Sequence, residues 1–275
     1  MKRNFLYSIA AFGLLALVPG IRKAVPANPA EQPSAVAESF FVREDKAGEN
    51  ASAETGRRAS DRESAYRNHT AELYEGLQLS KAGLDREVFT KALTGYYNLK
   101  AEGKLSEGSS ILSIADFSKP SREKRLWIID LDEKGLLYHT WVAHGKGSGG
   151  NTASKFSNTE SSHQSSLGFY VTGEVYYGKH GRSLRLDGMD AGFNSNARKR
   201  AIVLHGANYV SKSFIEQVGR LGRSYGCPAV STKLSNGIID HLKGKTVLYI
   251  DGPDSNYVSS YLNAQVAARM IPANG

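Results

Sequence analysis

The only cysteine of this 275-residue chain, Cys227, lies in a loop with glycines near both ends, Gly222–Pro228. A thiol becomes a strong nucleophile when it loses its proton, and a nearby imidazole both lowers its pKa and accepts that proton. His205 follows the apolar run Ile202–Leu204, as a histidine at the end of a buried strand does. Cys227 and His205 lie 22 positions apart, so only the fold can bring them together. The sequence predicts a nucleophilic Cys–His pair, with a buried structural cysteine and histidine as the alternative.

Pro228 restricts the loop around this cysteine. It biases Cys227 away from helical dihedral angles, and it has no N–H with which to stabilise an oxyanion. The available donors are the backbone amides of Gly226 and Cys227. We therefore expect these two amides to face the oxygen of a carbonyl under attack.

The residues around this loop predict a mainly β domain over 105–251. Its apolar runs are short, rich in β-branched and aromatic residues, and separated by Gly, Ser and Asn. Two short helices interrupt them, and the second ends at Gly244, which suits the position after a helix. The expected strands are 126–131, 136–143, 168–175, 201–204 and 246–250, and the expected helices are 211–218 and 233–242.

An α-helical segment over 60–104 precedes this domain. Ser60–Glu63 matches a capping box, and apolar residues between Leu84 and Tyr97 recur at three- and four-residue spacing. Residues 252–275 form a tail with turn residues and a weak helical pattern, which the sequence does not place.

The first 27 residues have the order of a secretory signal peptide. Lys2 and Arg3 precede the apolar run Phe5–Val18, and the small residues Ala24–Ala27 follow. The run is shorter than the roughly 20 residues of a membrane span, although an uncleaved anchor remains the alternative. Residues 28–59 contain no Leu or Ile, and we expect a disordered linker there. This start predicts a location outside the cytoplasm.

The net charge of +8 does not indicate a nucleic-acid partner. Cleavage after the signal-like segment would leave +4, because it removes four basic residues and no acidic one. The one dense basic run, Arg198–Arg200, has no aromatic residue within it, which favours a solvated strand entrance over a polyanion site.

The sequence also predicts no cofactor and no metal. Gly145–Gly150 opens no βαβ unit, and His144, His163 and His205 lack a compact ligand spacing. We expect His144 to line the substrate cleft or to brace its loop. The long Gly-, Ser- and Asn-rich segment 145–166 is the expected lid.

With its neighbours, the Cys–His pair resembles a known signature. His205-Gly206 followed by Ser224-Tyr225-Gly226-Cys227 is similar to the HG…SxGC pattern of L,D-transpeptidases with the YkuD fold, and in particular to the murein L,D-transpeptidase catalytic domain family. Further matching segments, between Leu84 and Ile250, are 114–121, 125–127, 142–149, 156–158, 165–170 and 184–188. The resemblance implies a YkuD-like β-rich domain.

The resemblance also implies a reaction. Cys227 would attack the carbonyl of the diaminopimelate residue of a peptidoglycan stem peptide and expel D-alanine. His205 would carry the proton, and the Gly226 and Cys227 amides would hold the oxyanion. An amine acceptor gives an L,D-crosslink and water gives a trimmed peptide, so L,D-carboxypeptidase activity is one alternative. A non-catalytic peptidoglycan-binding protein is another. The implied location is the periplasm or cell wall; nothing predicts an oligomeric state.

The chain departs from the commoner SHGCIR form of the superfamily. Tyr225 replaces the loop histidine, and Ala229 stands where an arginine is usual. Arg223 or Arg220 can substitute for that arginine, since guanidinium pairs well with carboxylates. With Ser224, Tyr225 and His144, these arginines complete the expected substrate-binding set. The residue that orients His205 is not readable from the sequence.

Overall fold

The computed structural model describes residues 46–271, with side chains from residue 54 onward. The signal-like segment and the first part of the expected linker lie outside the described residues. Among the described helices, none is long and apolar enough to cross a membrane.

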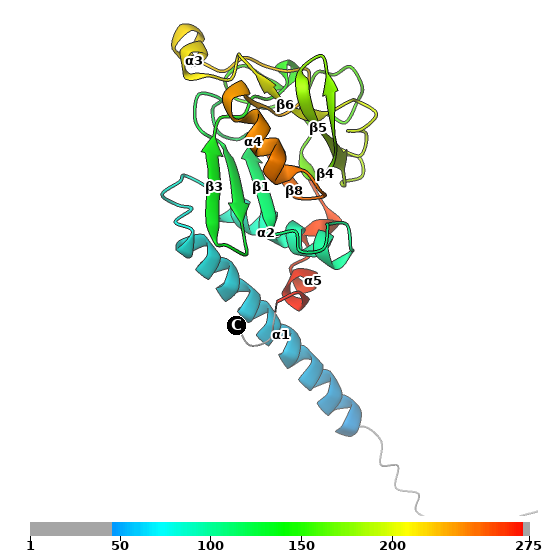
Figure 1. Cartoon of the computed structure of the whole chain (residues 1–275). Coiled ribbons are helices and arrows are strands. Elements are labelled where there is room, and N and C mark those ends of the chain that lie inside the picture. Colours follow the sequence, from blue (N-terminus) through cyan, green and yellow to red (C-terminus); the bar gives the residue numbers. More distant parts are fainter. Residues whose placement is uncertain (1–45, 272–275) are drawn as a thin grey trace, which may run out of the picture. The chain divides into compact units, whose positions relative to one another are not determined.

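One mixed sheet of eight strands forms the body of the chain (Figure 1). Its order is β3-β2-β1-β8-β4-β5-β6-β7, and neighbouring strands are antiparallel except for the parallel pairs β1/β8 and β6/β7. The strands are β1 Ile111–Asp116, β2 Leu126–Asp130, β3 Gly135–Thr140, β4 Gly168–Gly178, β5 Gly181–Gly188, β6 Val203–Ala207, β7 Ala229–Ser231 and β8 Val247–Asp251.

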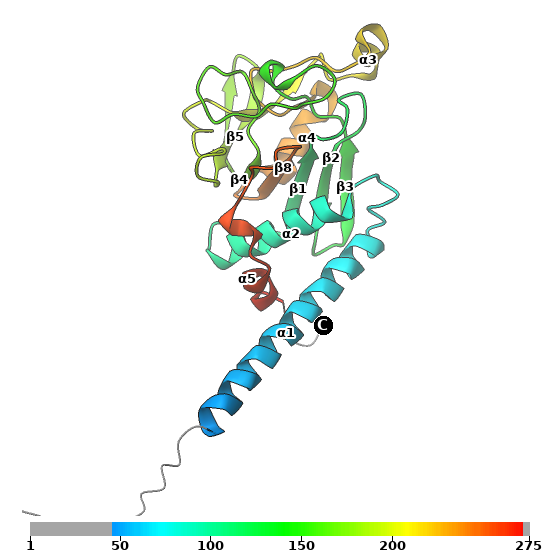
Figure 2. The same ribbon diagram turned by 180° about the vertical axis from the view of Figure 1, so that it is seen from behind.

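Two amphipathic helices cover opposite faces of the sheet, α4 toward the viewer in Figure 1 and α2 toward the viewer in Figure 2. Helix α2, Arg86–Ala101, is capped by the Asp85 carboxylate, which accepts from the amides of its first turn. Helix α4 is Thr232–Leu242. Adjacent strand residues face the two sides: Ile114 packs in the core under α2, and Ala115 in the core under α4.

The N-terminal helix α1, Lys46–Gly76, begins before Ser60, where the capping box predicted a start. Residues 46–59 are rich in Ala, Glu and Arg and contain no proline, so intrinsic helix propensity outweighs their lack of large apolar side chains. Tyr66 of α1 hydrogen-bonds to Thr94 of α2 at 2.7 Å. The tail, which the sequence did not place, forms η2, Ser260–Leu262, and α5, Ala264–Arg269, and α5 packs on α1 and α2.

The predicted fold class is confirmed: a β-rich domain with short helices follows α-helical N-terminal elements. All five expected strands exist, with shifted ends, and both expected helices exist, as α4 and as α3, Lys212–Val218. Strands β1, β5 and β7 are additional. At the sheet edge, β7 is only three residues long, and it carries the chain directly from the cysteine loop into α4.

Candidate active site

The parallel pair β6/β7 brings the cysteine and the histidine to one place. His205 is in register with Ala229, and Cys227 lies two residues before Ala229 on the same chain segment. Both side chains line one cavity of about 460 Å³. The fold therefore brings the two residues, 22 positions apart in the sequence, to the same cavity.

The cavity is electropositive. Its wall includes the cationic side chains of Lys179, Arg200 and Arg223, and no Asp or Glu lines it. The β4/β5 hairpin, the segment before β6 and the cysteine loop each supply one of these cations. A cavity of this kind favours a ligand that carries carboxylate groups.

His205 is held as a neutral base. Its side chain is buried, and its Nδ1 lies 2.9 Å from the carbonyl oxygen of Gly206. A carbonyl only accepts, so Nδ1 carries the proton and Nε2 keeps its lone pair. Burial lowers the pKa of His205, the Gly206 carbonyl opposes this, and the nearby His180 and Lys179 lower the pKa further. The residue that orients the imidazole, unreadable from the sequence, is thus the backbone of its own neighbour.

Cys227 is partly buried and rests as a thiol. Its Sγ lies 3.8 Å from the carbonyl oxygen of Ala201, toward which it donates. Burial raises its pKa, whereas the Val203 amide and the Arg200 guanidinium lower it. A thiol that shares a cavity with a neutral imidazole can still react if the imidazole accepts the proton as the sulfur attacks.

The turn before Cys227 is fixed by Ser224 and Gly226. The Ser224 hydroxyl donates to the Cys227 carbonyl at 2.6 Å and accepts from the Gly226 amide at 3.1 Å. Gly226 has φ +122°, and an added Cβ would lie 2.7 Å from the Gln164 carbonyl oxygen. Only glycine fits there. The Gly226 amide, expected to face an oxyanion, is engaged by Ser224 in this structure.

The expected substrate-binding residues divide into two groups. Arg223, Ser224 and Tyr225 line the cavity, and Arg223 also donates to the Gly149 carbonyl at 2.7 Å. Arg220 donates to the Leu221 carbonyl and does not line the cavity. His144 is fully buried and does not line it either.

His144 braces the loop that begins with Gly145. The fully buried Arg125 donates to His144 Nδ1 at 2.7 Å and to the Val142 carbonyl. The proton of the neutral imidazole therefore lies on Nε2, which has no hydrogen-bond partner among the described residues. Burial, followed by the charge of Arg125, lowers the pKa of His144 to about 4. Of the two roles expected for His144, the structure shows contacts for the second.

The segment 145–166, expected as a lid, is built into the wall of the cavity. Lys146 N donates to the Ser224 carbonyl at 2.8 Å, and Gly147 N donates to the His163 carbonyl at 2.9 Å. The exposed Tyr225 ring lies beside that of His163, with centroids 4.4 Å apart, and Lys146 Nζ lies 4.2 Å from the Tyr225 centroid. The segment is therefore tied to the cysteine loop by backbone and ring contacts.

Arg200 is a site residue that the sequence reasoning missed. It was grouped with Arg198 and Lys199 as a solvated run, and those two do form exposed ion pairs. Arg200 instead points inward and donates to the carbonyls of Ser157 and Gln164 at 2.7 and 2.6 Å. A signal existed: Arg200 is the last basic residue before the buried strand, where the chain turns inward.

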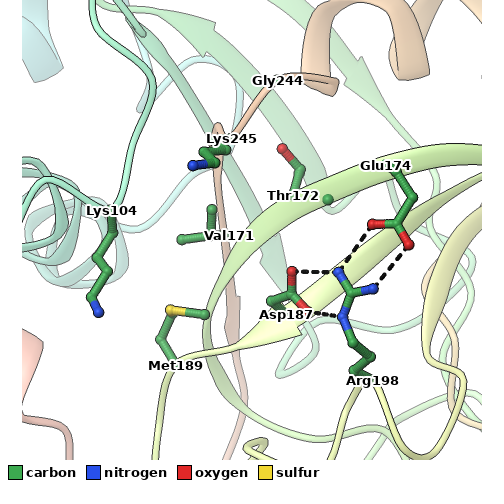
Figure 3. Close-up of a pocket in the computed structure, with 10 residues that line it drawn as sticks. Lys104, Val171, Thr172, Glu174, Asp187, Met189, Arg198, Gly244 and Lys245 are labelled. Carbon is green, nitrogen blue, oxygen red and sulfur yellow. Dashed lines mark hydrogen bonds and ion pairs between the residues drawn. The ribbon is translucent and has the colours of Figure 1, made fainter.

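A second cavity, of about 310 Å³, lies away from the cysteine (Figure 3). Figure 3 shows the Arg198 guanidinium between the carboxylates of Asp187 and Glu174, with Lys104 on the other side. Neither a cysteine nor a histidine lines it, and its central arginine is paired with two carboxylates. Among the described residues, no cluster of three or more His, Cys, Asp or Glu could hold a metal ion.

The L,D-transpeptidase catalytic domain matches residues 80–250, more than half of the chain, and includes both His205 and Cys227. No curated protein matches the chain in sequence.

Solved structures share only low similarity with the chain. The L,D-transpeptidase LdtMt1 in complex with imipenem is 10% identical, with a TM-score of 0.32 over 51% of this chain and 58% of its own. An L,D-transpeptidase from Mycobacterium smegmatis is 12% identical, with a TM-score of 0.32 over 52% of this chain and 58% of its own. The helical cell shape determining protein Pgp2 from Campylobacter jejuni is 12% identical, with a TM-score of 0.33 over 64% of this chain and 62% of its own. The chain thus spans less than two thirds of each. The extent of the domain match shows that this chain belongs to the L,D-transpeptidase catalytic domain family.

Proposed function

We propose that the chain is a cysteine-dependent L,D-transpeptidase that crosslinks peptidoglycan stem peptides through an acyl-enzyme on Cys227. The observation that carries the proposal is the shared cavity of Cys227 and His205, in which the imidazole keeps a free Nε2 and no other nucleophilic thiol exists in the chain. The cationic wall suits stem peptides, which carry free carboxylates.

The reaction has two halves. The Cys227 sulfur attacks the diaminopimelate carbonyl carbon while His205 Nε2 takes the thiol proton. The C–N bond to D-alanine then breaks, and the imidazolium gives its proton to the leaving amine. In the second half, an acceptor amine attacks the thioester and gives a proton to His205 Nε2, the C–S bond breaks, and His205 returns that proton to the sulfur. The amides of Gly226 and Cys227 are the proposed oxyanion donors, and the Gly226 amide must first exchange its bond to Ser224 for one to the oxyanion.

Substrate recognition is assigned to the cavity wall. Arg223 and Lys179 are the proposed partners of the peptide carboxylates, while Ser224 and Tyr225 shape the floor and mouth. Arg220 and His144 act only from outside the cavity, through the loops that they brace.

The proposal is tested with purified tetrapeptide muropeptides, incubated with the wild type, Cys227→Ala and His205→Ala, followed by mass spectrometry. Crosslinked dimers that depend on Cys227 support the transpeptidase. Tripeptides alone would assign the carboxypeptidase alternative, which leaves every named residue in the same role. If no product depends on Cys227, the non-catalytic alternative replaces both.

The proposed location is the periplasm or cell wall, where this substrate lies. Fractionation of the source cells, with the chain detected by antibody, tests it; full-length chain in the cytosol would contradict it.

A further inference from the structure

The β4/β5 hairpin places a second imidazole on the His205 ring. Gly178 pairs with Gly181, so Lys179 and His180 form a two-residue turn. The His180 ring stacks on that of His205, with centroids 4.2 Å apart and an interplanar angle of 19°. His180 is exposed, whereas only 2% of His205 is accessible. The outer ring thus forms a cover over the inner one.

Strand pairing fixes this arrangement. Ser183 of β5 is in register with His205 of β6, and the two strands are antiparallel. The turn that precedes Ser183 therefore extends past His205 toward the C-terminal end of β6. Tyr176 and Lys179 of the same hairpin line the cavity as well, so the hairpin is one wall of the site.

We propose that His180 is a positioning residue for the proposed acyl transfer: its ring covers the His205 imidazole and holds it in the orientation that leaves Nε2 as the free base. The inference deepens the proposed function and rests on it. Nothing in the resemblance to the family assigns a role to this residue.

The single hydrogen bond from Nδ1 to the Gly206 carbonyl is not sufficient to fix the ring, because the imidazole can still swing about that contact. A flat ring against one face removes this freedom at little entropic cost. It also keeps water from that face, and burial is the largest cause of the lowered pKa of His205. The pKa of His180 is itself lowered, by burial and by Lys179, so both rings are neutral near pH 7.

The charges around His205 also lower its pKa. The titratable and charged groups that line the cavity with His205 are Tyr176, Lys179 and His180 from the hairpin, His163 from the segment 145–166, Arg200 from the segment before β6, Tyr209 from the loop after β6, and Arg223, Tyr225 and Cys227 from the cysteine loop. None is a carboxylate, so no anionic side chain in the cavity stabilises a protonated His205. The cover thus keeps the base neutral before attack.

The test measures the pKa of His205 directly. Full-length chain carrying ¹³C-labelled histidine is titrated by NMR, and the His205 signal is assigned by its loss in His205→Asn. We compare the wild type with His180→Ala, which removes the cover, and with His180→Phe, which keeps a flat ring without a titrating group. Tyr177→Ala is the matched control, because Tyr177 is 80% exposed in the same hairpin and does not line the cavity.

We expect the titration midpoint of His205, which is its pKa, to rise toward the ordinary value of 6.5 in His180→Ala. In His180→Phe and Tyr177→Ala the midpoint should stay at its wild-type value. In His180→Ala, the fall of muropeptide turnover at acid pH should shift to higher pH together with the pKa of His205. Turnover near pH 5.5 should therefore fall by about threefold or more relative to turnover near pH 8. An unchanged midpoint in His180→Ala, or equal midpoints in the Ala and Phe variants, would overturn the proposal. His180→Asn, which suits a turn, replaces Ala if the Ala variant fails to fold. Absence of turnover in every variant would sink the proposed function instead, while the NMR midpoints still decide the role of His180.

Discussion

The Ser224 hydroxyl donates a 2.6 Å hydrogen bond to the carbonyl oxygen of Cys227 and accepts another from the Gly226 amide. One side chain therefore closes the turn that presents the thiol. It also occupies an amide that the proposed reaction requires, so the hydroxyl both shapes the loop and competes with the oxyanion. Substitution of Ser224 separates the shaping of the loop from the competition with the oxyanion.

Ser224→Ala tests the turn. The substitution leaves the part-buried Cys227 carbonyl without its donor, which we expect to cost about 1 kcal/mol of unfolding free energy. Misplacement of the thiol should lower the acylation rate roughly tenfold to a hundredfold. Chemical denaturation and single-turnover kinetics measure both. Ser224→Thr keeps the hydroxyl and should retain most of the unfolding free energy and most of the acylation rate. An acylation rate for Ser224→Ala at or above that of the wild type would show that competition for the Gly226 amide dominates.

Gly226→Ala tests the close approach of the loop to its neighbours. Its φ of +122° and the 2.7 Å distance from an added Cβ to the Gln164 carbonyl leave no room for a side chain. We expect loss of acylation and a lower Tm. Gly192→Ala is the matched control, because Gly192 has φ +81° with open space around it, and backbone strain alone should cost about 1–2 kcal/mol. Equal losses of stability in the two variants would contradict the steric argument.

The sequence predicted those features of the site that depend on a few neighbouring residues. The strand next to His205 and the glycine-rich loop of Cys227 are readable because each is determined by a few adjacent residues. The strand was expected to end before His205, but it runs on to Ala207 through its pairing with β5 and β7, so His205 lies in its middle. His180 is not readable in this way, since its place on the His205 ring depends on the β5/β6 register. Long-range pairing of this kind leaves no mark on the adjacent sequence.

Among the helices and strands, too, those with a clear local sequence pattern were predicted and the others were not. Helix α2 and strands β2, β4 and β8 have apolar patterns long enough to be recognised. Strand β7 has three residues, too few for a period. Helix α1 extends before Ser60 because helix propensity, rather than an apolar stripe, stabilises the turns there. Composition alone predicted a linker there.

Arg200→Ala tests the charge next to the thiol. Arg200 lowers the pKa of Cys227, so its removal should raise that pKa and slow alkylation by iodoacetamide near neutral pH. The chain has one cysteine, so labelling followed by intact-mass spectrometry reports on this thiol alone. Lys199→Ala is the control, because Lys199 pairs only with the exposed Glu160. Faster labelling in Arg200→Ala would indicate that the bonds from Arg200 to the Ser157 and Gln164 carbonyls, which restrict access, outweigh its charge.

His144 predicts a pH dependence of stability. Its pKa is lowered from 6.5 to about 4, so protonation favours the unfolded chain. Its contribution is complete above about pH 6.5 and falls as the pH decreases toward 4, by about 3 kcal/mol in total. His144→Asn, which can accept from Arg125 without titrating, should lose less unfolding free energy over that range in urea titrations. Parallel curves for the two proteins would show that another group carries the acid sensitivity.

Tyr225 should influence whether an acceptor amine or water releases the peptide from the proposed acyl-enzyme. Its ring, 60% exposed, lies between Lys146 and His163 and joins the cysteine loop to the segment 145–166 at the mouth of the cavity. Transpeptidation requires that an acceptor amine reach the thioester before water does, so a looser mouth should favour hydrolysis. Tyr225→Ala should therefore lower the ratio of crosslinked dimers to tripeptides, measured by mass spectrometry of the muropeptide products. Tyr225→Phe keeps the ring and should keep the ratio. If Tyr225→Ala lowers both products equally, the ring positions the donor peptide and does not control the acceptor.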